Sequence, residues 1–154
     1  MSKKKELKSL NSATINLQNR RVRDIDNKKC LISLEKAMIS NSNYGLCLNS
    51  AHSHSKEQNS KKYNTALIDL FHTLCKMTWN DIDRISKHNK GGYERLSVDI
   101  IKSETIQNHF KNLGRDKFII FRFGSDFRAC GFRQMDIFYL VCIDYDYSLY
   151  NHGS

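Results

Sequence analysis

The sequence lacks the motifs that define several common enzyme classes. It contains no glycine-rich P-loop ending in GK[ST], no HExxH metal-binding motif and no GxSxG nucleophile elbow. Nucleotide hydrolysis of the P-loop kind and serine-esterase chemistry are therefore not expected. Proline is absent from all 154 residues, and no function follows from that absence.

Long apolar runs are also missing. No run approaches the ~20 residues that a membrane-spanning helix needs, and the first ten residues, MSKKKELKSL, lack the apolar segment of a secretory signal. We therefore expect a cytoplasmic protein with no membrane partner. The length suits one domain, or a smaller domain behind an arm.

Cysteine is present without the spacing of a metal site or a disulfide framework. The five cysteines are odd in number and widely spaced: Cys30, Cys47, Cys75, Cys130 and Cys142. Most have apolar neighbours in the sequence, which predicts reduced core residues. The alternative is a zinc site built from Cys47, His52, His54 and Cys75, but no pair has the tight CxxC spacing of a closed structural site. We expect neither a metal nor a cofactor.

Positive charge is concentrated in the first part of the chain. Residues 1–62 carry 13 Lys and Arg against 5 Asp and Glu, which leaves +8 of the formal +9, whereas residues 63–154 carry 12 against 11. Such asymmetry favours a polyanion, either nucleic acid or the RNA surface of a ribosome. Residues 1–27 are predicted to form a basic flexible arm that binds nucleic acid through Lys3, Lys4, Lys5, Arg20, Arg21 and Arg23. The alternative is solvated, flexible charge without a ligand.

The middle of the chain predicts helices after an uncertain first strand. Residues 28–39 alternate like a strand with Cys30, Ile32 and Leu34 on one face, although part of the segment also fits a helical turn. Residues 49–62 have the composition of a loop. Apolar residues then recur at helical spacing from Tyr63, and Thr78 with Asp81 forms a capping box for a second helix. We therefore predict an antiparallel helical hairpin over residues 63–88.

A sheet is expected in the last third of the chain. Gly91 and Gly92 end the hairpin, residues 96–101 read as a strand, and residues 103–114 favour a short helix closed by Gly114. Three apolar blocks follow from Lys117, as in an antiparallel meander. The predicted fold is a single α+β domain, residues 28–153, in which the hairpin packs on a small antiparallel sheet over residues 96–150. Trp79 is expected in the core, and His72 and His88 on the surface.

Two arginines give the meander a functional character. With a three-residue loop at Gly124–Asp126, Phe123 pairs with Phe127 and Arg122 lies directly opposite Arg128. Like charges in this position need an anion between them, and a phosphate fits the planar fork of arginine. Alternatively, Asp126, Asp144 or Asp146 closes a surface salt bridge. A two-residue loop, Ser125–Asp126, would place Arg128 opposite Phe123 and separate the pair. We expect both arginines at the surface.

The layout of residues 63–153 resembles the RelE/ParE-like superfamily of toxin–antitoxin systems. The resemblance rests on a helical hairpin, a glycine-marked exit, and a meander that carries arginines and ends in YDYSLYNH. It implies a toxin-like endoribonuclease, a hydrolase that cuts mRNA, in the ribosome or free, by metal-free attack of the 2′-hydroxyl on the adjacent phosphate. The catalytic residues it implies are Arg122, Arg128, Arg133, Tyr150 and His152. It leaves the first 60 residues unaccounted for.

Two non-enzymatic alternatives stay open. The protein can be a phage or mobile-element factor whose basic arm binds nucleic acid or a host complex. It can also be an inhibitor of a host enzyme, with an edge strand such as Asp136–Asp144 pairing with a strand of the host protein or of an antitoxin.

Overall fold

A computed structural model describes residues 25–39, 44–46, 57–125 and 127–151 of the chain. It shows a mixed α/β protein built on a five-stranded sheet with the strand order β1-β5-β4-β3-β2. Its strands are β1 (Leu31–Ser33), β2 (Tyr93–Ser97), β3 (Lys117–Phe123), β4 (Phe127–Gln134) and β5 (Ile137–Asp144). Its helices are α2 (Glu57–Lys76), α3 (Trp79–Asp83), the 3₁₀ turn η1 (Val98–Ile100) and α4 (Glu104–Asn112).

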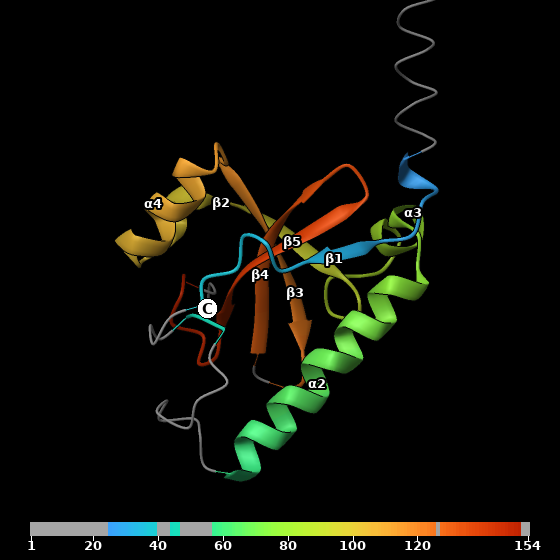
Figure 1. Ribbon diagram of the computed structural model, residues 1–154, viewed down its shortest axis with the longest axis horizontal. Helices are drawn as coiled ribbons and strands as arrows, with labels where there is room; N and C mark the ends of the chain where they lie inside the picture. Colours follow the sequence, from blue (N-terminus) through green and yellow to red (C-terminus); the bar gives the residue numbers. More distant parts are fainter. Residues whose placement is uncertain (1–24, 40–43, 47–56, 126, 152–154) are drawn as a thin grey trace, which may run out of the picture.

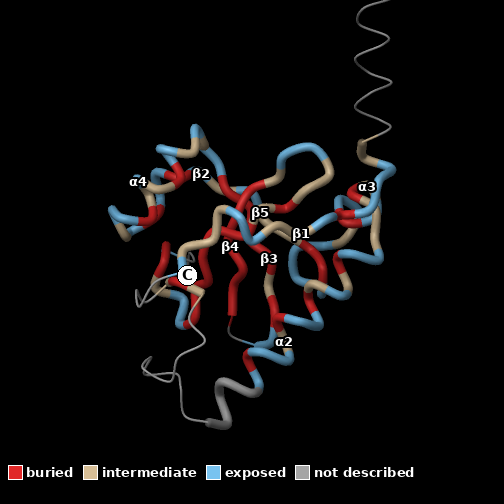
Figure 2. Tube along the Cα trace, viewed as in Figure 1, coloured by how far each residue is buried: buried red, intermediate tan, exposed pale blue. Residues whose placement is uncertain are grey.

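Helices cover the sheet on both faces, with α2 and α4 on opposite sides (Figure 1). Alternate residues of each strand point to opposite faces, and two separate apolar clusters result. One joins α2 and α3 to one face of the sheet through residues such as Leu70, Trp79 and Phe121. The other joins η1 and α4 to the opposite face through Phe110 and Phe118. Figure 2 shows the buried residues concentrated along the three central strands.

The C-terminal meander is confirmed. β3 pairs antiparallel with β4, and β4 pairs antiparallel with β5. The short helix is confirmed as α4: the Ser103 hydroxyl accepts from the Ile106 amide at 3.4 Å, and Gly114 follows with a φ of +70°. Trp79 is fully buried, as expected. The sequence signals for these elements are local, because each involves residues close together in the chain.

The predicted helical hairpin is not confirmed. The Thr78 capping box is present, but α3 is only 5 residues long, and turns and bends occupy most of residues 84–91. In contrast, α2 begins at Glu57, inside the segment predicted as a loop. The predicted strand at residues 96–101 is displaced, since β2 ends at Ser97 and η1 follows it. Most of the predicted basic arm lies outside the described residues.

The first strand changes the sheet from the expected antiparallel arrangement. β1 pairs parallel with β5, with Leu31 opposite Ile137. Therefore β5 is an interior strand, and the expectation that Asp136–Asp144 forms an edge is wrong. The edges of the described sheet are β1 and β2. None of the described helices is long and apolar enough to cross a membrane.

Candidate functional site

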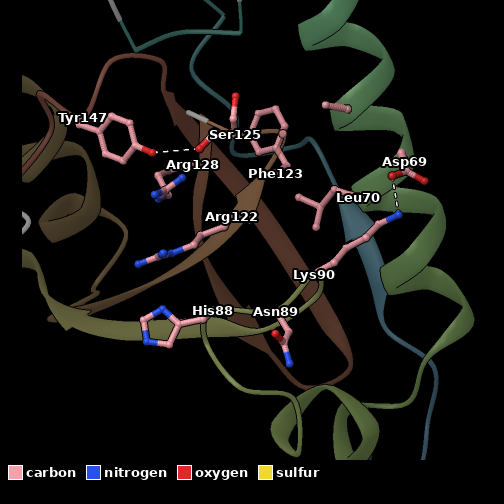
Figure 3. A pocket seen from close by; sticks show the side chains of 12 residues that line it. Asp69, Leu70, His88, Asn89, Lys90, Arg122, Phe123, Ser125, Arg128 and Tyr147 are labelled. Carbon is pink, nitrogen blue, oxygen red and sulfur yellow. Dashed lines mark hydrogen bonds and ion pairs between the residues drawn. The ribbon is translucent and has the colours of Figure 1, made fainter.

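A polar hollow of about 450 Å³ lies beside the hairpin that joins β3 and β4. We call it the Arg122–Arg128 pocket. Its lining comes from α2, from the turn before β2, from the hairpin and from the segment after β5 (Figure 3). The polar side chains in that lining are those of Asp69, His88, Asn89, Lys90, Arg122, Ser125, Arg128 and Tyr147. Three cations and one carboxylate therefore border the same space.

The pairing predicted for the two arginines is confirmed. Arg122 lies opposite Arg128 and Phe123 opposite Phe127, which is the register of the three-residue loop. Gly124 occupies this loop with a φ of +57°, a conformation that glycine adopts without the strain a side chain would add. The two guanidiniums lie side by side in Figure 3. The strand pairing thus places two positive charges in one pocket.

Carboxylates compensate the arginine pair on both sides. Arg122 Nη2 lies 3.2 Å from Oε1 of Glu94, a residue of β2 that sequence reasoning did not consider. Asp144, one of the three aspartates considered, lies directly opposite Arg128 on β5 and is fully buried. Asp126 lies outside the described residues. Acids from both neighbouring strands therefore offset the repulsion between Arg122 and Arg128.

Arg128 is buried, which contradicts the expectation of two surface arginines. Only 4% of it is exposed, and its Nη1 donates to the Phe127 carbonyl at 2.9 Å. The Tyr147 ring lies 4.5 Å from its guanidinium carbon, a cation–π contact. Its Nε has no hydrogen-bond partner within the described part of the chain. Arg128 is thus a fixed cation with an unused donor, whereas the Arg122 side chain is 37% exposed.

Tyr147 holds a rare backbone conformation above this cation. Its φ is +63°, although it is not glycine, and its hydroxyl donates to the Ser125 carbonyl at 3.0 Å. Strained residues of this kind cluster at functional sites. Here the conformation brings the aromatic ring over Arg128, and the hydrogen bond ties the segment after β5 to the β3–β4 hairpin.

The turn before β2 supplies pocket residues that sequence reasoning missed. Lys90 Nζ pairs with Asp69 of α2 at 2.5 Å, and both side chains are 55% exposed. His88, predicted as a surface residue, is exposed and also lines the pocket. The available signal was the cluster HNK directly before Gly91, because that glycine, with a φ of +83°, turns the chain toward β2.

The remaining predicted site residues do not line this pocket. Tyr150 is 5% exposed, and burial, followed by neighbouring acidic groups, raises the pKa of its phenol. Arg133 is five residues from Arg128 on β4, roughly 16 Å along the strand, where it pairs with Asp26 and packs over the Trp79 ring. His152 and the six basic residues of the arm lie outside the described residues.

No described group of three His, Cys, Asp or Glu side chains can hold a metal ion. Most of the proposed zinc ligands, Cys47, His52 and His54, lie outside the described residues. Of the four described cysteines, Cys75 is exposed and the other three are buried with free thiols. Comparisons with protein families, with curated proteins and with solved structures found no match.

Proposed function

We propose that the protein is a toxin-like endoribonuclease that cuts mRNA, either on the ribosome or free, without a metal. The observation that carries the proposal is the opposed pair Arg122 and Arg128 in a pocket that also exposes His88. Two guanidiniums side by side match the oxygens of a phosphate. An imidazole within the same space offers a proton acceptor that works near neutral pH.

The two arginines would have different roles. Arg128 is fixed by the Phe127 carbonyl and the Tyr147 ring, so it would stabilise negative charge on the non-bridging oxygens without rearranging. Arg122 is partly exposed and would exchange Glu94 for the phosphate. His88 would accept the proton of the 2′-hydroxyl, which attacks phosphorus to give a 2′,3′-cyclic phosphate. The released 5′-oxygen would take a proton from solvent.

The test uses purified full-length protein, single-stranded RNA and a metal chelator. Wild type is expected to produce fragments with cyclic phosphate ends, and Arg122→Ala to lower kcat/KM by about 100-fold or more, the usual cost of one charge-stabilising donor. The matched control is Arg84→Ala, which removes an exposed arginine outside the pocket. Both variants should keep the wild-type circular dichroism spectrum. Intact RNA with wild type, or equal losses in both variants, would contradict the proposal.

Arg128 needs a milder substitution than alanine. Removing a buried cation beside the buried Asp144 would cost about 3–5 kcal/mol, so lost activity would not separate catalysis from folding. Arg128→Lys keeps the charge but loses the planar fork. We expect a folded variant whose induced expression no longer arrests growth or fragments total RNA.

A non-enzymatic nucleic-acid or host-complex binding protein is the second candidate. Carboxylates compensate the pocket cations in the free protein: Glu94 at Arg122, Asp144 at Arg128 and Asp69 at Lys90. The strongest uncompensated charge lies in residues 1–62. Salt-dependent RNA binding by wild type without any cleavage would favour this function. A ribosome, an antitoxin and a host protein are the partners to test by affinity capture.

A further inference from the structure

A second cationic hollow lies at the opposite end of β3. It has a volume of about 240 Å³, and its charged lining consists of Arg95, Arg115, Asp116, Lys117 and Arg133. We call it the Arg95 hollow. Four cations face one carboxylate here, so its balance is more positive than that of the Arg122–Arg128 pocket. Neither the catalytic proposal nor the basic arm involves this site.

The strand register brings two of these cations together. Arg95 of β2 lies opposite Ile119, and Lys117 of β3 lies opposite Ser97. Arg95 and Lys117 are therefore diagonal neighbours on one face of the sheet, within reach of each other's long side chains. Neither makes a printed-length ion pair or side-chain hydrogen bond with another residue that the structure describes. Both are exposed, so their charges are available to a ligand.

Arg115 is held in position at the rim of the same hollow. Its guanidinium lies 4.2 Å from the centre of the Phe132 ring, and its Nη2 donates to Gln134 Oε1 at 2.7 Å. Its Nε has no hydrogen-bond partner among the residues that the structure describes. Arg133 differs, because Asp26 already pairs with it. Three cations, Arg95, Arg115 and Lys117, are thus available to an anion, and one of them is preorganised.

The two sites lie along the same strand. Lys117 and Arg122 are five residues apart on β3, which corresponds to roughly 16 Å, and β2 beside them is an edge strand. One phosphate cannot reach both sites, but a chain of phosphates can. A cationic groove that follows a backbone is how proteins bind single-stranded nucleic acid without reading its sequence.

We infer that the Arg95 hollow binds a second backbone phosphate of the RNA strand that occupies the Arg122–Arg128 pocket. This inference rests on the proposed function and defines its substrate class: an extended single strand rather than a nucleotide or a short RNA end. Cleavage therefore takes place at internal positions of the RNA, where phosphates extend from the pocket toward the Arg95 hollow.

The experiment compares full-length wild type with the double variant Arg95→Gln, Lys117→Gln. Binding of two fluorescent single-stranded RNAs, of about 3 and about 12 nucleotides, is measured against salt concentration; the longer RNA is within the site sizes known for single-strand binders. The control is Lys76→Gln, Lys102→Gln, which removes the same charge from exposed residues outside both sites. The catalytically impaired Arg122→Ala variant is measured in parallel.

For the long RNA, we expect the double variant to lose about tenfold in affinity, as for one charged hydrogen bond, and about 0.7 in the salt slope, as for one phosphate contact. The short RNA should bind the double variant and wild type equally. Equal losses on both RNAs, no loss on the long RNA, or the same loss in the lysine control would overturn the inference. Cleavage that depends on Arg122 would then leave the proposed function standing, whereas wild type that neither binds nor cuts RNA would overturn both.

Discussion

At the scale of single residues, Glu94 determines how much of the Arg122 charge a ligand meets. It comes from β2, lies 3.2 Å from Arg122, and also has Lys87 at 3.9 Å. Its side chain is 22% exposed, so solvent screens the pair and the interaction with Arg122 is worth no more than about 1 kcal/mol. A phosphate that binds Arg122 must compete with this carboxylate.

Glu94→Gln should therefore tighten RNA binding by about two- to fivefold, because about 0.5–1 kcal/mol of competition is removed. The measurement is RNA affinity across a range of salt concentrations. Glu104→Gln removes one exposed negative charge from the first turn of α4, outside the pocket, and serves as the control. An equal effect of both substitutions would mean that net charge, rather than release of Arg122, governs binding.

The opposed arginines were predictable because their register depends on the local spacing FRFGSDFR. Their difference in burial was not, since it depends on Glu94 and Tyr147, residues from elsewhere in the chain. The same reason explains why Lys90 and His88 were missed. Their place in the pocket depends on how the turn before β2 packs beside the β3–β4 hairpin, a contact between segments about 35 residues apart.

At the scale of elements, a bulge between β4 and β5 places Asp144 beside Arg128. Cys130 lies opposite Cys142, but Gly131 lies opposite Leu140, so Val141 is the additional residue. A shift of one residue moves side chains to the other face of a sheet. The bulge thus allows both ends of β5 to pair correctly while Asp144 stays on the face of Arg128. Gly131 is needed because Tyr139 O would lie 2.0 Å from an added Cβ.

Gly131→Ala is expected to destabilise the protein by about 3 kcal/mol or more, since the carbonyl of Tyr139 is backbone and cannot turn aside. Gly114→Ala is the control: its φ of +70° costs about 1–2 kcal/mol, but nothing lies within 4 Å of the added methyl group. Urea unfolding of both variants gives the comparison. A smaller loss for Gly131→Ala than for Gly114→Ala would contradict this account of the bulge.

Elements with local signals were predicted better than those that depend on distant pairing. The Thr78 capping box and the Ser103 cap are each formed within four residues, and the meander is joined by short turns. β1 instead pairs with β5, more than 100 residues away, and it does so in parallel. Alternation of apolar residues identifies a strand but neither its neighbour nor its direction.

At the scale of the whole molecule, the basic excess and the proposed site occupy different parts of the sequence. Residues 1–24 carry seven Lys and Arg against two Asp and Glu, whereas the lining of the Arg122–Arg128 pocket begins at Ala66. Asp26 lies between the two and pairs with Arg133, and the Trp79 amide donates to the Lys28 carbonyl. These contacts connect the start of the described chain to α3 and β4, so a truncation must spare them.

Removal of residues 1–24 tests whether the basic segment supplies general affinity for RNA or part of the chemistry. We expect the truncated protein to unfold at the wild-type temperature, to bind RNA more weakly with a smaller salt slope, and to show a higher KM with an unchanged kcat. The reason is that electrostatic attraction acts equally on bound substrate and transition state, which changes KM alone. Circular dichroism and single-turnover cleavage provide the measurements. A large loss of kcat with intact folding would place catalytic groups before residue 25, and unchanged binding would reject the segment as an RNA-binding element.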